Sequence, residues 1–456
     1  MRMIRMLLCC LIAAMNLQAQ TNDDSVFIRK IANEILTNGD AYENLRTLTK
    51  KVGPRLAGSP ASYKAEQWGL EALRKAGAEK AWLQECQVPR WVRGGKESAV
   101  VRFDGKKSMP LNVLALGNSE GTKGRKLTAP LIEIASFDEL EQKKDQVKGK
   151  IVFYNYEFNP TFIRTFHSYG DAVKYRGEGA SRAAKLGAVG VLVRSMSHAA
   201  DNHPHTGSLR YNDSFPKVPA LALGLQDANE LSERLKKSAG TAELISFARM
   251  LPDTLGNNVI GEIIGTEFPN EFITVGGHID SWDTGEGAHD DGAGCVQAIE
   301  VLNVLKKLGY KPKRTIRAVL FANEENGLRG GTAYAEQAKA KGEKHYFALE
   351  SDAGGFTPRG FGFTGTDAQL EKMRGWLPLL KDYQVSFINK GGGGADIGPL
   401  NRTFGTPVCG LEPDSQRYFD IHHAPSDVFE AVNKRELELG AINMAALIYL
   451  VDKYGL

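Results

Sequence analysis

From Asn258 to Leu456 the sequence repeatedly places a short apolar run before a helical segment, and no other feature limits the possible folds as strongly. Strands that alternate with helices along a chain are typical of a parallel sheet covered by helices on both faces. We therefore expect an α/β fold in this part of the chain. The 456 residues exceed the length of about 250 to 300 residues at which single cores stop growing, so we also expect a second domain.

Polar residues follow four of the expected strands, at or shortly after the point where each strand ends. The groups are Gly276-Gly277-His278-Ile279-Asp280 with His289-Asp290-Asp291, Asn323-Glu324-Glu325, Ser351-Asp352, and His422-His423. Ligands of an open α/β sheet bind outside the carboxyl ends of its strands, so we expect these groups to meet in one crevice. Glycines flank them, which suits a backbone that bends sharply off a strand.

Five of these residues are of the types that bind zinc through nitrogen or carboxylate oxygen. They are His278, Asp290, Glu325, Asp352 and His423. Five ligands are too many for one tetrahedral zinc with an open position, but they suit two ions that share a bridging carboxylate. Two Zn²⁺, three carboxylates and one hydroxide also sum to zero charge. The sequence thus predicts two Zn²⁺ per chain, which would polarise a carbonyl and supply hydroxide at neutral pH.

Two further carboxylates have expected roles beside the metals. Glu324 adjoins a ligand and is not needed as one, so we expect it to be the general base that takes the proton of the bridging water. Asp280 follows His278 by two residues and is expected to accept the second ring N–H of that histidine. An isolated Glu pair is usually only solvated charge, so the interpretation depends on the joint pattern.

The chain before Asn258 shows a different pattern of expected helices and strands. Amphipathic spacing predicts helices near its start and over residues 61–75. From Leu127 to about Phe247, short apolar strands alternate with helices expected at residues 179–186 and 225–237. This region is interpreted as an insert. The expected division separates the insert, residues 127–247, from residues 20–126 before it and residues 248–456 after it.

The first 19 residues are interpreted as a secretory signal peptide. Arg2 and Arg5 form a basic start, Met6 to Met15 form a short apolar run, and Ala19 offers a small residue for cleavage. The run is too short to span a bilayer, so we expect an exported protein, secreted or periplasmic. An N-terminal anchor helix is the alternative interpretation.

Composition excludes several kinds of partner. The 57 Lys and Arg residues against 54 Asp and Glu residues give a net charge of +3, which argues against binding nucleic acid or membranes through net charge. No later stretch is long and apolar enough for a membrane span. The cysteines after the signal, Cys86, Cys295 and Cys409, are odd in number and widely spaced, so we expect no disulfide framework.

The joint pattern resembles the co-catalytic zinc exopeptidases of peptidase family M28, which include bacterial aminopeptidases. The matching segments are Gly276 to Gly294, Glu324-Glu325, Glu350 to Phe356, and His423 with Asp427 four residues later. Two more segments, Val88-Pro89-Arg90-Trp91 and Pro204-His205-Thr206-Gly207, resemble one branch of that family in particular. The resemblance covers nearly the whole mature chain. It implies a phosphorylase/hydrolase-like zinc peptidase domain, with a mixed and mostly parallel sheet, and an inserted protease-associated (PA) domain.

The resemblance also implies roles for single residues. Asp290 would be the bridging ligand, His278 and Asp352 would bind one zinc, and Glu325 and His423 would bind the other. The four-residue spacing to Asp427 favours His423 over His422 as the ligand. His422 would then face the substrate and stabilise the oxyanion, or only support its neighbours.

Histidines and glycines outside the ligand set have their own interpretations. His198, His203 and His205 could bind metal, but we favour a solvated loop that reaches over the active site. Gly391 to Gly394 lacks the Lys-Ser/Thr of a phosphate loop and is expected to shape a substrate pocket. His289 is expected to be a bystander.

We therefore expect an exported metallo-exopeptidase that hydrolyses dipeptides or terminal residues of short peptides. The alternatives are a one-zinc aminoacyl cyclase of the glutaminyl cyclase type and a non-catalytic binding protein with the same domains. A homodimer is implied by the resemblance alone. Preference for the amino or carboxyl end stays open, because Arg329, Arg359 and Arg402 cannot be placed from the sequence.

Overall fold

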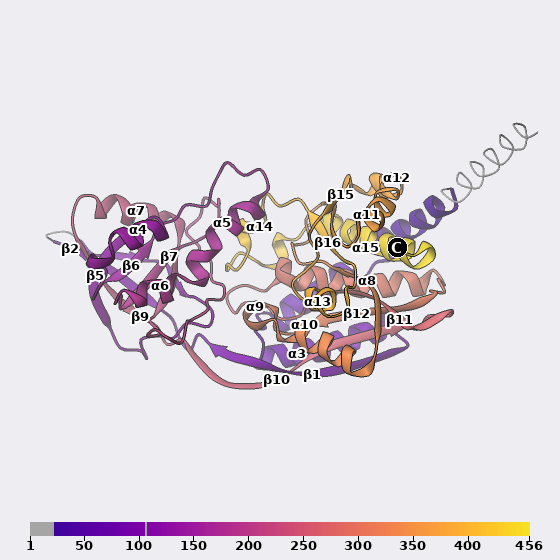
Figure 1. The fold of residues 1–456 in the computed structure, drawn as a ribbon, viewed down its shortest axis with the longest axis horizontal. Helices are drawn as coiled ribbons and strands as arrows, with labels where there is room; N and C mark the ends of the chain where they lie inside the picture. The colour runs from indigo at the N-terminus through magenta and orange to yellow at the C-terminus, as the bar shows by residue number, and fades with distance from the viewer. Residues whose placement is uncertain (1–21, 105–106) are drawn as a thin grey trace, which may run out of the picture.

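The computed structural model describes residues 22–104 and 107–456, which form two eight-stranded sheets lying side by side (Figure 1). The strand order is β1-β10-β12-β11-β13-β16-β14-β15 in the first sheet and β3-β2-β9-β5-β6-β7-β8-β4 in the second. Helices accompany both sheets, so the predicted α/β class is confirmed. The expected signal peptide lies outside the described residues.

The first sheet is mixed, with four parallel strands at its centre. These are β12 (Arg314–Phe321), β11 (Phe268–His278), β13 (Lys344–Glu350) and β16 (Val408–Pro413). The flanking strands are β1 (Lys80–Val92), β10 (Arg249–Ile263), β14 (Pro358–Thr364) and β15 (Phe387–Lys390). Antiparallel pairing joins β1 to β10, β10 to β12 and β14 to β16. The strands expected to carry the polar groups therefore end along one edge.

Helices cover both faces of this sheet, as alternation along β12 shows. Ala318 and Leu320 belong to one hydrophobic core, whereas Val319 and Phe321 belong to another on the opposite face. The first core is shared with α3 (Pro60–Lys75), α8 (Ala293–Lys307) and α15 (Lys434–Tyr454), and the second with α10 (Arg329–Lys341) and α13 (Gly398–Phe404). The helix expected over residues 61–75 is confirmed.

The second sheet is inserted between β1 and β10, which pair antiparallel along most of their length. Its strands are β2 (Ser98–Phe103), β3 (Met109–Leu111), β4 (Val113–Ala115), β5 (Leu127–Ile134), β6 (Ile151–Tyr154), β7 (Gly190–Arg194), β8 (Ala220–Leu223) and β9 (Gly240–Ile245). Three of them, β2, β3 and β4, precede Leu127 in the sequence. They belong to this sheet because β2 pairs with β3 and β9, and β4 pairs with β8. The second sheet therefore begins at Ser98 and not at residue 127.

Four helices accompany the second sheet: α4 (Phe137–Gln142), α5 (Thr165–Gly177), α6 (Gly179–Lys185) and α7 (Leu225–Leu235). The sequence predicted α6 and α7 but not α5, which has two glycines and no clear apolar stripe. Tertiary packing against α14 (Tyr418–Ile421) compensates, since Phe166 stacks on Tyr418 at 5.4 Å and Tyr169 on Phe419 at 4.8 Å between ring centroids. Helix α5 thus connects the second sheet to the polar crevice of the first.

The remaining helices lie around the first sheet. They are residues 22–38, α2 (Ala41–Thr47), α9 (Glu324–Gly327), α11 (Asp367–Arg374) and α12 (Leu377–Leu380). Within the described ranges, no helix is both long enough and apolar enough to cross a membrane. Cys86, Cys295 and Cys409 are all buried free thiols, as the absence of a disulfide pattern predicted.

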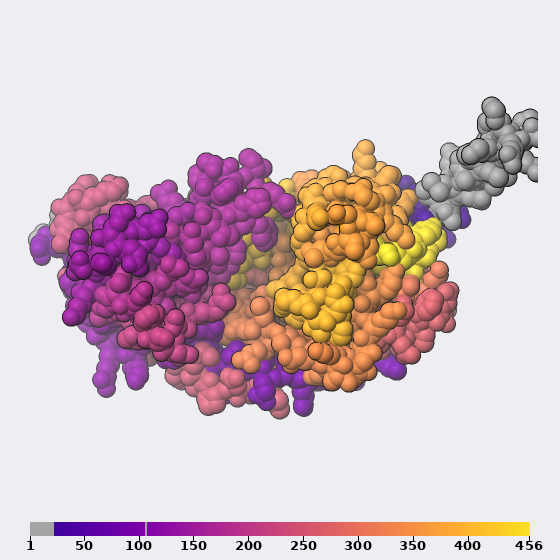
Figure 2. Space-filling view, in the orientation of Figure 1, coloured from indigo at the N-terminus to yellow at the C-terminus, as the bar shows by residue number. Residues whose placement is uncertain are grey.

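The chain forms two lobes, the first built on the first sheet and the second on the inserted sheet. They meet at a recess between the magenta and orange surfaces (Figure 2). A cavity of about 580 Å³ lies there, lined by Tyr169 and Arg176 from α5 and by Asp290, Glu324 and His422 from the first lobe. The crevice expected at the strand ends therefore has a second wall, which comes from the inserted sheet.

Candidate metal centre

The five predicted ligands converge around the Asp290 carboxylate at the end of β11. His278 Nε2 lies 3.2 Å from Asp290 Oδ1 and 3.3 Å from Asp352 Oδ1. On the other side, His423 Nε2 lies 3.2 Å from Asp290 Oδ2 and 3.1 Å from Glu325 Oε2. Asp290 therefore presents one oxygen to each of two groups of ligand atoms.

These spacings fit metal ions better than hydrogen bonds. Ligand atoms held about 2.0–2.1 Å from one tetrahedral ion lie about 3.3 Å apart, close to the distances found here. Among the described residues, the buried atoms His278 Nε2 and Asp290 Oδ2 have no hydrogen-bond partner. Buried polar atoms seldom lack one, so their arrangement indicates that cations complete the site.

The pKa shifts of the clustered carboxylates also favour bound cations. Burial raises the pKa of Glu325 well above its usual range, and the neighbouring Asp290 raises it further. Burial also opposes ionisation of Asp290, but the His278 and His423 rings outweigh it and hold the pKa of Asp290 well below its usual range. Carboxylates packed this closely repel one another, and bound divalent cations would remove that repulsion.

Three side chains behind the ligands hold the backbone of the ligand-bearing loops through hydrogen bonds. Asp427 accepts the backbone N–H of His289 at 2.7 Å and of Asp290 at 3.1 Å. Asp291, joined to Asp290 by a cis peptide bond, accepts the N–H of His278 at 3.0 Å. The fully buried Arg55 donates to the carbonyl oxygens of Glu286 at 2.7 Å and Gly287 at 2.9 Å, besides Ile279.

Asp280 lies beneath the Glu324-Glu325 turn and beside His278. Its carboxylate accepts the backbone N–H of Glu324 at 3.0 Å and of Glu325 at 3.4 Å. The His278 Nδ1 atom is 3.1 Å from the backbone oxygen of Asp280 and 3.7 Å from its carboxylate. The nearer acceptor for the His278 ring is therefore the backbone of Asp280, and the carboxylate mainly orients the two glutamates.

Glu324 lines the cavity next to the ligands. Its carboxylate accepts no hydrogen bond from the described residues, so its oxygens are free to exchange a proton. Burial raises the pKa of Glu324 to about 8, and the nearby Asp352 and Asp290 charges add to the rise. A carboxylate in this state suits general acid/base chemistry near neutral pH.

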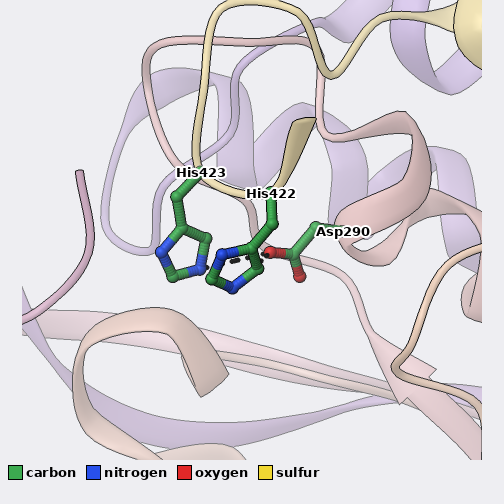
Figure 3. Close-up of side chains that lie close together, drawn as sticks. All are labelled: Asp290, His422 and His423. Atoms are coloured by element: carbon green, nitrogen blue, oxygen red, sulfur yellow. Dashed lines mark ion pairs between the residues drawn. The ribbon is translucent and has the colours of Figure 1, made fainter. Parts of the chain in front are cut away.

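His422 and His423 lie against each other and both face Asp290 (Figure 3). Their ring centroids are 3.5 Å apart, and His422 Nε2 is 3.7 Å from Asp290 Oδ2. Of the two rings, His423 also contacts Glu325, and both line the cavity. Burial, together with the adjacent His423, lowers the pKa of His422 well below its usual range, so this ring is neutral.

The remaining histidines do not join the site as ligands. His289 accepts the N–H of Gly355 at 3.0 Å and stacks on Phe356 at 4.2 Å, which is a structural role. His203 is half-buried and pairs with Asp201 at 3.2 Å. His205 is buried, contrary to the expected solvated loop, because the next residue, Thr206, donates its N–H to the His423 carbonyl oxygen at 3.0 Å.

A second cavity of about 660 Å³ adjoins Asp352. The run Gly391 to Gly394 lines it, together with Phe387 and Arg359. Its position fits the expected role of this glycine run in shaping a pocket. Arg359 pairs with Asp414 at 2.9 Å.

No sequence pattern predicted the positions of Arg55 and Arg176. Arg55 has no acidic partner in the described residues and acts through backbone carbonyls far along the chain. Arg176 lies on the unexpected helix α5, 247 positions from the residue it adjoins, His423. Contacts of this kind leave no local pattern in a single sequence.

Comparisons with known proteins agree with the geometry. Residues 258–448 match the sequence profile of peptidase family M28. Carboxypeptidase Q of Mus musculus is 36% identical over 90% of this chain and 85% of its own length, and carboxypeptidase Q of Homo sapiens is 35% identical over similar shares. The resemblance to this family and to one of its branches is thereby confirmed.

Solved structures give the same result. A peptidase M28 precursor from Shewanella amazonensis superposes with a TM-score of 0.89 at 30% identity, covering 95% of this chain and 97% of its own. The zinc aminopeptidase BSAP from Bacillus subtilis shares the fold, with a TM-score of 0.65 at 20% identity over 90% and 94% of the two chains.

Proposed function

We propose that this chain, which belongs to peptidase family M28 and is a metallopeptidase, hydrolyses dipeptides or removes single terminal residues from short peptides. The observation that carries the proposal is the position of Asp290 between His278 and His423, at 3.2 Å from each. The names of similar proteins, carboxypeptidase Q and zinc aminopeptidase, agree with an exopeptidase.

The proposed site holds two zinc ions. His278 and Asp352 would bind one and Glu325 and His423 the other, with Asp290 shared between them. Such a pair of ions supplies a polarised scissile carbonyl and water acidic enough to attack at neutral pH.

In the proposed reaction the chain's own residues orient the substrate and move its protons. Glu324 takes a proton from the attacking water and delivers it to the leaving amine, for which its unpaired carboxylate is suited. Asp280 holds Glu324 in place through the Glu324 backbone. The neutral His422 donates an N–H to the oxygen that becomes negative when the carbonyl is attacked.

We also propose that the sheet of residues 98–245 is the inserted PA domain, and that it closes the substrate cavity. Tyr169 and Arg176 contribute to the cavity wall from that insert. The sequence before residue 20 supports export as a secreted or periplasmic protein. A homodimer remains part of the proposal, on the resemblance alone.

Hydrolysis of a dipeptide panel tests the proposed function. The purified protein should cleave several dipeptides, lose this activity on dialysis against a chelator and regain it when zinc is added. Cyclisation of an N-terminal glutamine substrate without dipeptide cleavage would favour the aminoacyl cyclase instead. No turnover of any substrate by the zinc-loaded protein would favour a binding protein.

A further inference from the structure

The guanidinium of Arg176 is buried in the cavity wall without a carboxylate partner. Arg176 is 6% exposed, and among the described residues its guanidinium contacts a carbonyl oxygen, a histidine ring and a hydroxyl but no carboxylate. Its Nε atom is buried and makes no hydrogen bond. A buried arginine is normally paired, so an unpaired one at the edge of a substrate cavity suggests that the substrate supplies the anion.

The contacts that Arg176 does make leave most of its N–H groups free. Nη2 donates to the Tyr169 hydroxyl at 2.6 Å, and Nη1 lies 3.4 Å from both the Thr206 carbonyl oxygen and His423 Nδ1. If His423 Nε2 binds a metal, Nδ1 carries the ring proton and donates to Thr206 at 3.3 Å. Nδ1 is then not an acceptor for Arg176, which keeps the Nη1 side available.

Gly207 makes room for this arginine beside His423. A Cβ at Gly207 would lie 2.4 Å from Arg176 Cζ and 2.7 Å from His423 Nδ1, and the φ angle of +128° also favours glycine. Gly207 ends the Pro204-His205-Thr206-Gly207 segment that the sequence singled out without a function. The glycine of that segment therefore allows the Arg176 side chain to approach His423.

The charges on the cavity walls are separated. Asp290, Glu324, Glu325 and Asp352 lie on the floor, whereas Lys174, Arg176 and Arg210 line the wall that comes from the insert. That wall also carries one carboxylate, Glu178, which pairs with Arg182 at 2.8 Å. The floor carboxylates would be neutralised by the proposed ions, but the wall cations would not. The cavity thus favours a ligand with a negative charge on the side of the insert.

We propose that Arg176 binds the C-terminal α-carboxylate of the substrate, one residue beyond the scissile bond. The inference rests on the proposed peptidase function and specifies its substrate as a dipeptide, or a short peptide cut at its last bond. Successive Cα atoms are about 3.8 Å apart, so a carboxylate one residue beyond the scissile bond lies close to the metal ligands. Arg176 is also close to them, because its Nη1 lies 3.4 Å from Nδ1 of the ligand His423. A guanidinium binds such a carboxylate through two parallel hydrogen bonds.

The test compares Ala-Ala with Ala-Ala-amide, which differ only in the terminal charge and carry no side-chain carboxylate. The wild-type protein should cleave Ala-Ala roughly 10- to 100-fold faster in kcat/KM, as expected for a hydrogen-bonded charge pair. Arg176→Met should lose this preference by slowing only Ala-Ala, and Arg176→Lys should keep part of it. Arg102→Met, an exposed arginine of the same insert paired with Glu243, is the matched control and should behave as wild type.

Binding gives a readout that does not depend on turnover. In a Glu324→Gln background, calorimetry should show that Arg176→Met weakens binding of Ala-Ala and leaves Ala-Ala-amide unchanged. Equal cleavage of both substrates by the wild-type protein would overturn the inference and leave the proposed function standing. Cleavage of neither substrate, nor of any other dipeptide, would refute the proposed function and the inference with it.

Discussion

The Asp427 carboxylate accepts the backbone N–H of Asp290 at 3.1 Å, so a loop near the end of the chain positions the central carboxylate of the site. Asp427 is buried, and the same carboxylate accepts the N–H of His289 at 2.7 Å. The spacing between His423 and Asp427 thereby has a physical reason. His423 contacts the ligand atoms while Asp427, four residues later, holds the backbone of Asp290.

Asp427→Asn should weaken metal binding without removing a ligand. One of the two backbone N–H groups would face an amide NH₂ and lose its acceptor, so Asp290 would be less well oriented. Loss of such a supporting contact typically costs about 10- to 100-fold in metal affinity. Competition with a chelator measures the affinity for zinc. Asp213→Asn, at an aspartate side chain that is 90% exposed, should leave it unchanged.

Arg55→Met should destabilise the loop from Ile279 to Gly287. The substitution removes the donor from the carbonyl oxygens of Ile279 and Glu286, whereas Gly287 keeps the N–H of Gly292 at 3.0 Å. Unsatisfied buried groups cost about 1–3 kcal/mol each, so we expect a loss of about 3 kcal/mol or more in the free energy of unfolding. Urea denaturation measures it. The exposed Arg402→Met is the control, and equal effects of the two substitutions would refute this role of Arg55.

Glu300 on α8 should make the stability of the fold depend on pH. Burial raises the pKa of Glu300 to about 7 from its ordinary value of 4.5, although Asp40 and Asn303 donate hydrogen bonds to it. The unfolded chain therefore releases this proton first, and stability falls as the pH rises from about 4.5 through 7.

Glu300→Gln should remove that loss. Between pH 5 and pH 8 the free energy of unfolding should shift in favour of the variant by about 2–3 kcal/mol relative to wild type. Denaturation curves across this range provide the measurement. Glu43→Gln, at a side chain that is 68% exposed, should show no such shift. Parallel pH profiles for Glu300→Gln and wild type would contradict the expected titration.

Glu324→Gln should abolish most turnover and keep the metals. The amide cannot carry the proton, so kcat should fall by about 10²- to 10⁴-fold, whereas the five ligands are untouched. Steady-state kinetics and metal analysis of the same sample give both quantities. Glu336→Gln, on the exposed side of α10, should retain wild-type values. A Glu324→Gln variant with near wild-type kcat would remove Glu324 from the reaction.

The sequence was most informative where local pattern and packing agree. Strands β11, β12 and β13 are apolar runs buried on both faces, so their ends, and with them His278, Glu325 and Asp352, could be placed in advance. Their convergence on Asp290 followed from the topology of the sheet. The position of Asp427 was known from its spacing, but its hydrogen bonds were not.

Long-range contacts set the limit of prediction. Helix α5 is held by aromatic stacking on residues about 250 positions away, and Arg176 comes to the site with it. Strands β2, β3 and β4 are short, so only their pairing with β9 and β8 assigns them to the second sheet. The boundary expected at residue 127 missed them for that reason.

Zinc content per chain tests the central claim most directly. After loading with zinc and removal of loosely bound metal, mass-spectrometric metal analysis of the wild-type protein should return close to two zinc ions per chain. His278→Ala and His423→Ala should each lower that value, because they remove a ligand from different sides of Asp290. A wild-type value near one or zero, in a folded sample, would contradict the two-zinc site on which the account depends.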